Sequence, residues 1–123
     1  MSSAITISKS RSSAIHIKKM LQKLGYSDVA TGDFQNLPRI SQPSIAVVEY
    51  QYLAYERIVN IIESLVKRNV FIILHTPVKE ELMFSAVCSL YAYFVTPFRG
   101  LFNLDSLKQT LGSRTNRKHW FPH

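Results

Sequence analysis

The chain has a single cysteine and no run of apolar residues long enough to cross a membrane. Cys88 has no partner for an internal disulfide, which fits a protein of the reducing cytoplasm. A membrane-spanning segment needs roughly 18 consecutive apolar residues, and no stretch of the sequence reaches that length. Residues 1–4 do not begin the charged-then-apolar pattern of a signal peptide. We therefore expect a cytoplasmic protein without a membrane span.

The chain also lacks the residue clusters that metal sites and covalent catalysis need. Its four histidines are scattered along the sequence, at His16, His75, His119 and His123. No group of them has the spacing of a metal site, and no hydroxyl or thiol is paired with a base in a recognisable motif. These absences predict no metal, no cofactor and no enzymatic activity.

Acidic residues are scarce, with 8 Asp and Glu against 15 Lys and Arg, so the net charge is +7. Much of the excess lies in the first predicted helix and near the C-terminus, at Arg11, Lys18, Lys19, Lys23, Arg114, Arg117 and Lys118. A basic surface attracts nucleic acid and acidic proteins, but a solvated surface is the simpler interpretation. The charge alone leaves contact with nucleic acid undecided.

The periodicity of apolar residues indicates strands and helices in alternation. Strands are predicted at residues 4–7, 27–31, 44–49, 70–74 and 93–95. Helices are predicted at residues 12–24, 55–68, 79–90 and 104–111, with a loop or one short helical turn at 33–40. Gly25 and Gly112 are predicted to end two of these helices, and Asn103 is predicted to cap the start of the last one.

This alternation predicts an α/β protein with a flavodoxin-like fold. The run from Ile45 to Val48 is apolar without a break, as in a parallel strand covered on both faces. The expected architecture is a (βα)5 doubly wound parallel sheet with strand order 2-1-3-4-5. Residues 1–112 form one domain, and residues 113–123 form a flexible basic and aromatic tail. The working site is expected at the carboxyl ends of strands 1, 3 and 4.

Four short segments at these strand ends carry a resemblance to a known family. They are Ile7-Ser8-Lys9-Ser10-Arg11, Val47-Val48-Glu49-Tyr50, Ile73-Leu74-His75-Thr76 and Tyr93-Phe94-Val95-Thr96-Pro97-Phe98. Over residues 4–112 the chain resembles the receiver domain of two-component response regulators. The resemblance implies a signalling function, but most of the family's phosphorylation residues are replaced.

Position by position, the resemblance assigns a role to seven residues. Glu49 stands where the family has its phospho-accepting aspartate, and Ser8 and Lys9 stand where it has two acidic magnesium ligands. The family's hydroxyl, aromatic and lysine-proline switch positions correspond to Thr76, Tyr93, Thr96 and Pro97. Of these four, Thr96 replaces the lysine, and the other three keep the family's residue type.

The replacements argue against magnesium binding and phosphorylation. Magnesium prefers hard oxygen ligands, and one carboxylate beside the ammonium of Lys9 is a poor site. The extra methylene of Glu49 displaces the accepting oxygen by roughly 1.5 Å, which exceeds the positioning tolerance of about 1 Å. We instead expect a Lys9–Glu49 ion pair, assisted by Thr76, that fixes one conformation; a partly solvated Glu49 is the alternative. His75 is expected to pack as a neutral imidazole or to face solvent.

The helix at 79–90 is apolar nearly all round, which predicts a surface for a protein partner. The residues expected on this surface are Met83, Phe84, Val87, Tyr91 and Phe102. In the family that the chain resembles, the corresponding face forms dimers or binds effectors. We expect a regulator, an effector or a second copy of the chain as the partner.

Together these features predict an atypical receiver-like signalling module that works without phosphorylation, through protein–protein interaction. Two alternatives remain open. Residues 8–13 open a helix whose N–H groups attract phosphate, which would suit an anion- or phosphate-ligand-binding flavodoxin-like domain, although that loop has no glycine. The basic surface would suit a nucleic-acid-binding accessory protein.

Overall fold

The computed structural model describes residues 3–33, 35–38, 43–49, 55–76, 82–91, 94–99 and 103–120. The side chains at 55, 56, 82–85, 99 and 113–120 are outside that description. The elements in chain order are β1 (Ser3–Ile7), α1 (Arg11–Lys23), β2 (Asp28–Gly32), β3 (Ile45–Glu49), α2 (Tyr55–Lys67), β4 (Phe71–Thr76), α3 (Leu82–Leu90), β5 (Val95–Arg99) and α4 (Leu104–Trp120).

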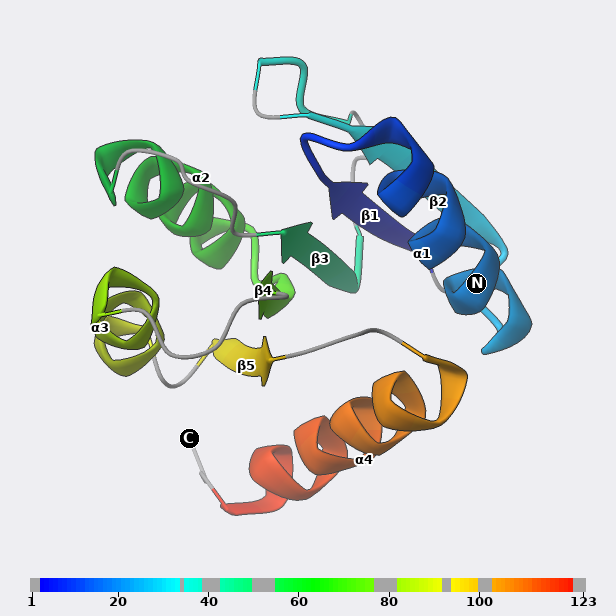
Figure 1. Ribbon diagram of the computed structural model, residues 1–123. Coiled ribbons are helices and arrows are strands. Elements are labelled where there is room, and N and C mark those ends of the chain that lie inside the picture. Colours follow the sequence, from blue (N-terminus) through cyan, green and yellow to red (C-terminus); the bar gives the residue numbers. More distant parts are fainter. Residues whose placement is uncertain are drawn as a thin grey trace.

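The five strands form one parallel sheet in the order β2-β1-β3-β4-β5, which confirms the predicted flavodoxin-like topology. Helices α1 and α4 cover one face of the sheet, and α2 and α3 cover the other (Figure 1). The carboxyl ends of all five strands therefore lie at one edge, as they must in a parallel sheet with right-handed crossovers.

Both faces of the sheet are buried, which explains the unbroken apolar strands in the sequence. Successive side chains of a strand point to opposite faces. Val48 packs in the core beneath α2 and α3, whereas Val47 packs in the core beneath α1 and α4. Ile62 of α2 and Leu21 of α1 are fully buried members of these two cores.

The ends of α1 follow from local chemistry. Ser10 caps the N-terminus, and its hydroxyl accepts a hydrogen bond from the N–H of Ser13 at 3.3 Å. At the other end Gly25 has a φ of +105°, a conformation that glycine adopts without steric cost. The predicted stop at Gly25 is confirmed, and the helix begins at Arg11, one residue before the predicted start.

The last helix begins where the sequence predicts and ends later. Asn103 caps it, because its side-chain oxygen accepts the N–H of Ser106 at 2.8 Å. The predicted end at Gly112 is wrong, since the backbone of α4 stays helical to Trp120. Gly112 does not have the positive φ that ends a helix, so it is an interior residue of α4.

The last strand also differs from its prediction. It was expected at residues 93–95 and spans Val95–Arg99, so it includes Pro97. Proline cannot donate a hydrogen bond to a neighbouring strand and is confined to edge strands. Because β5 is the edge of the sheet, Pro97 is tolerated there.

The connection between β2 and β3 is non-helical over its described residues. Asp33 organises a tight turn, since its carboxylate accepts the N–H groups of Gln35 and Asn36 at 2.9 and 2.7 Å. Of the alternatives at residues 33–40, the described part fits the loop. Among the helices that the structure describes, none has the length and apolar character to cross a membrane.

Candidate functional site

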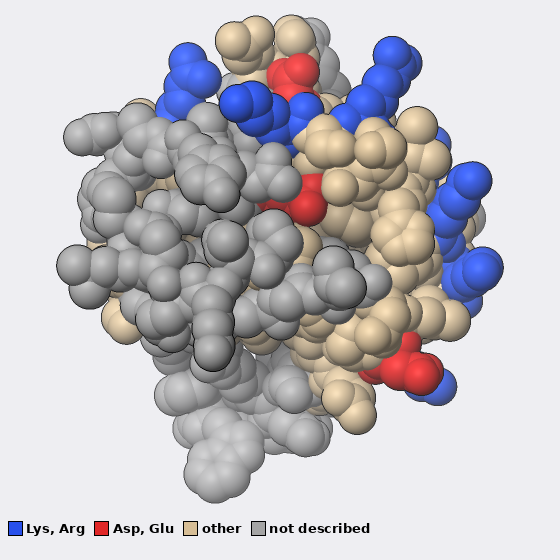
Figure 2. Space-filling view, viewed as in Figure 1, with Lys and Arg blue, Asp and Glu red and all other residues tan. Residues whose placement is uncertain are grey.

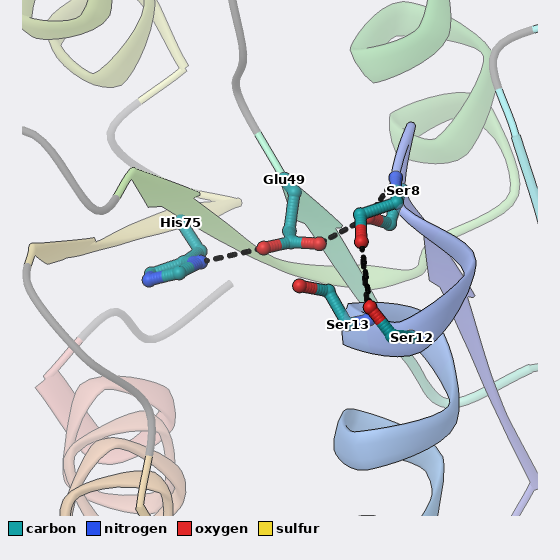
Figure 3. Close-up of polar contacts among 6 residues, drawn as sticks. Ser8, Ser12, Ser13, Glu49 and His75 are labelled. Carbon is teal, nitrogen blue, oxygen red and sulfur yellow. Dashed lines mark hydrogen bonds and ion pairs between the residues drawn. The ribbon is translucent and has the colours of Figure 1, made fainter.

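Three polar side chains meet at the carboxyl edge of the sheet. Ser8 directly follows β1, Glu49 ends β3, and His75 lies one residue before the end of β4. The strand register aligns them, because Ile7 pairs with Val48 and Glu49 pairs with His75. Figure 3 shows Glu49 between the other two, with its carboxylate pointing toward both.

Glu49 is almost fully buried, with 3% of its surface exposed, and both of its carboxylate oxygens are engaged. The hydroxyl of Ser8 donates a hydrogen bond to Oε1. Nδ1 of His75 lies 3.3 Å from Oε2. These contacts offset the cost of burying a polar group.

The backbone around α1 holds Ser8 in place. The hydroxyl of Ser8 accepts the N–H of Ser10 at 3.0 Å, and the N–H of Ser8 donates to the carbonyl of Gly32 at 3.1 Å. Ser10 is in turn the N-cap of α1. The hydroxyl that contacts Glu49 is therefore fixed both by the end of β2 and by the start of α1.

His75 connects Glu49 to the hydrophobic core beneath α4. Its imidazole packs edge-on against the ring of Phe98, with ring centroids 5.6 Å apart and an interplanar angle of 62°. Phe98 is its register partner on β5. Phe98 belongs to the same core cluster as Leu107 of α4. A continuous set of contacts thus runs from the carboxylate to the last helix.

The expected Lys9–Glu49 ion pair is not formed. The structure pairs Glu49 with His75, and the side chain of Lys9 is exposed. The reason is that both carboxylate oxygens already have partners, Ser8 on Oε1 and His75 on Oε2. Ser8 is buried beside the carboxylate, whereas its neighbour Lys9 is exposed.

Sequence reasoning placed His75 at the site but missed its contact with Glu49. Of the two expectations, packing or exposure to solvent, the structure shows packing, with 5% of His75 exposed and its Nδ1 next to the Glu49 carboxylate. A signal for it was present in the sequence. Two adjacent parallel strands that end at the same level bring their last polar side chains together, and Glu49 and His75 are such a pair.

Of the other switch positions, the structure describes Thr76, Thr96 and Pro97. Thr76 is buried at the end of β4, but the alternation of side chains puts it on the opposite face from His75. Thr96 and Pro97 pair with Ile73 and Leu74, so they lie two residues and one residue short of the level of His75, respectively. Tyr93 lies outside the described residues.

The expected partner surface is corrected in part. Val87 is fully buried against the sheet, so it belongs to the core and not to an exposed surface. Tyr91 is half-buried, and its hydroxyl donates to Glu63 of α2 at 2.7 Å. Phe102 and the side chains of Met83 and Phe84 lie outside the described part of the chain. The large apolar side chains that are exposed near β5 are Leu90 of α3 and Leu104 of α4.

Comparisons with known proteins support the fold and go no further. No model of a known protein family matches the chain, and no curated protein matches it. A solved structure that resembles it is the solution NMR structure of a de novo designed Rossmann 2x3 fold protein. The two share 14% sequence identity with a TM-score of 0.64, over 92% of this chain and 91% of the designed one. At that identity the likeness establishes a Rossmann-like α/β fold alone.

Proposed function

We propose that this protein is a receiver-like signalling module that works without phosphorylation and acts by binding other proteins. The observation that carries the proposal is the state of Glu49. It occupies the phospho-acceptor position of the receiver resemblance, yet it is buried and holds hydrogen-bond partners on both oxygens. A carboxylate in this state has a fixed orientation.

The surroundings of Glu49 support the absence of phosphoryl transfer. Transfer to a carboxylate needs a free oxygen in line with the donor and positive charge to neutralise the phosphoryl oxygens. Both oxygens of Glu49 are engaged, and Lys9 faces solvent. Over the described residues, no group of three His, Cys, Asp or Glu side chains is placed to hold a metal ion.

The order of the three side chains favours binding over catalysis. In a serine-nucleophile triad the imidazole lies between the hydroxyl and the carboxylate. Here the carboxylate of Glu49 lies between Ser8 and His75 (Figure 3). Ser8 is also almost fully buried. The arrangement stabilises one conformation at the sheet edge and does not activate Ser8 for attack.

The surface beside β5 supports a role in protein binding. Leu90 at the end of α3 is 61% exposed, and Leu104 at the start of α4 is 38% exposed. Leu90 ends the helix that precedes β5 and Leu104 begins the helix that follows it, so they are two separate exposed sites on opposite faces of the sheet (Figure 1). The contacts from Glu49 through His75 and Phe98 reach the core of α4. The fixed conformation at Glu49 would thereby be maintained at the partner surface.

We expect the protein not to bind a phosphoryl mimic at Glu49. With magnesium and beryllofluoride, its amide NMR spectrum should remain that of the free protein at Ser8, Glu49, His75 and Thr76, because no oxygen of Glu49 is free. A phosphorylatable receiver domain treated in the same way serves as the positive control. Selective shifts at these four residues in the presence of both reagents would contradict phosphorylation independence.

We expect charges at the two exposed leucines to abolish partner binding. The double variant Leu90→Glu, Leu104→Glu should lose the proteins that the wild type captures as bait, because a carboxylate in an apolar interface is desolvated without a partner. Leu37→Glu is the matched control, since Leu37 is 42% exposed in the loop after β2, the opposite edge strand. The same proteins captured by all three baits would contradict this assignment of the surface.

A further inference from the structure

The outward face of α1 carries a regular stripe of three cations and one isoleucine. These residues recur at intervals of four positions and all are exposed: Arg11, Ile15, Lys19 and Lys23. At 1.5 Å of rise per residue the stripe is about 18 Å long. The helix contains no acidic residue. Figure 2 shows lysine and arginine side chains gathered on the side of the molecule where Figure 1 places α1.

This arrangement is unfavourable for the helix itself. Arg11 lies in the first turn, where the helix dipole repels a cation, and no acidic residue in that turn compensates. Lys19 and Lys23 are like charges at i and i+4, which destabilise a helix. Only the position of Lys23 in the last turn favours the dipole. Positions where local rules are broken are expected at functional surfaces.

No neighbouring acid within the described residues neutralises the stripe. The ion pair that the structure describes is His75–Glu49, and none of Arg11, Lys19 and Lys23 has an ion-pair partner in that part of the chain. The nearest strand, β2, contributes Asp28 at its start, which is exposed. Beyond its end, Asp33 uses a carboxylate oxygen for its own turn.

The stripe also has apolar character and a hollow. Ile15, between two of the cations, is 44% exposed, although it lies on the solvent side of the helix. A surface hollow of about 440 Å³ lies along the second half of α1, lined by His16, Lys19, Met20, Gln22 and Lys23. A face that combines cations, an exposed isoleucine and a hollow suits a ligand with acidic and apolar side chains in alternation.

We propose that the outward face of α1 is the docking site for an acidic amphipathic helical segment of another protein. Its Asp and Glu side chains would pair with Arg11, Lys19 and Lys23, and an apolar side chain between them would pack on Ile15. This mode is the binding of one helix along a basic, partly apolar face. The surface is distinct from the one around Leu90 and Leu104, so the inference stands whether or not the proposed function is correct.

Nucleic acid fits the same face less well. Proteins that bind single strands supply aromatic side chains on which bases stack, and α1 contains no Phe, Tyr or Trp. One inner position of the stripe is the exposed Ile15. A site for a phosphate backbone would be expected to have a cation there. Charge complementarity together with this apolar centre therefore favours an acidic protein segment.

The test is a selection of displayed helical peptides, randomised on one face, against the 123-residue chain. We expect the selected peptides to carry Asp or Glu at spacings of four residues around an apolar residue. The variant K19Q/K23Q should bind them roughly tenfold more weakly, because two exposed ion pairs are lost. I15S should also weaken binding. The matched control K67Q/K108Q removes two exposed cations from α2 and α4 and should bind within about twofold of the wild type.

Three outcomes would overturn the proposal. Selected peptides without enrichment in Asp and Glu would exclude an acidic partner. Equal binding to the wild type and to K19Q/K23Q would exclude the location. A short DNA duplex that binds more tightly than the best peptide, and that K19Q/K23Q releases, would assign the face to nucleic acid. Because all substituted positions are exposed, an amide spectrum that is unchanged away from the substituted residues verifies that each variant is folded.

Discussion

Replacing Glu49 with alanine is expected to lower the free energy of unfolding by about 3 kcal/mol. The substitution removes the acceptor that Ser8 and His75 share, and both side chains are almost fully buried. A buried donor without an acceptor loses its bond to water and gains nothing in return. The truncation also leaves a cavity at the edge of the core. Urea unfolding of the wild type and the variant measures the difference.

Two further variants separate the causes. Glu49→Gln keeps an oxygen that accepts from Ser8, so its cost should be about 1 kcal/mol. Lys9→Ala should change stability by less than about 0.5 kcal/mol, because Lys9 is an exposed side chain. A loss for Lys9→Ala as large as that for Glu49→Ala would restore the Lys9–Glu49 pair and refute the assignment of His75 as the partner.

The architecture was predictable because the central strands are apolar on both of their faces. The apolar run from Ile45 to Val48 favours a strand covered on both faces, as in a parallel sheet with helices on both sides. The stripe of Ile17, Met20 and Leu21 has the period of a helix with one buried face, and all three are buried. These patterns repeat along the chain, so the strand order followed from general topological rules.

Element ends were harder to predict because they depend on competing local effects. Gly25 and Gly112 present the same signal, a glycine after an apolar stripe, but only Gly25 adopts a positive φ. The strand containing Pro97 was placed too early, since proline argues against a strand unless the strand is at the edge. Whether β5 is an edge strand is a property of the whole sheet and not of its own residues.

The location of the candidate site was predictable from the sequence, but the side chains that contact Glu49 were not. The sequence placed Ser8, Glu49 and His75 at strand ends that converge, and they do converge. The choice of partner for Glu49 was wrong because opposite charge was weighed above side-chain direction. Just beyond β1, Ser8 is buried beside the carboxylate and Lys9 is exposed. The same neglect of direction placed Val87 on the surface, although it is on the buried side of α3.

Replacing Gly32 with alanine is expected to lower the free energy of unfolding by roughly 2 kcal/mol. A Cβ at this position would lie 2.5 Å from the backbone oxygen of Asn36 and 2.6 Å from the ring of Pro38. Neither is the end of a flexible side chain, so the turn after β2 must shift. The carbonyl of Gly32 accepts the N–H of Ser8. The amide resonance of Ser8 should therefore move in the same variant, which connects this turn to the contact with Glu49.

Gly112→Ala is the matched control and should have the opposite sign. Nothing lies within 4 Å of a Cβ at Gly112, and the residue is inside α4. Alanine there should raise the free energy of unfolding by up to about 1 kcal/mol, because glycine loses more backbone entropy in a helix. Thermal unfolding of both variants shows whether the free energy of unfolding falls for Gly32→Ala and rises for Gly112→Ala. A loss at Gly112 would mean that the helix ends there in a left-handed glycine, and a neutral Gly32→Ala would mean that the turn does not constrain Ser8.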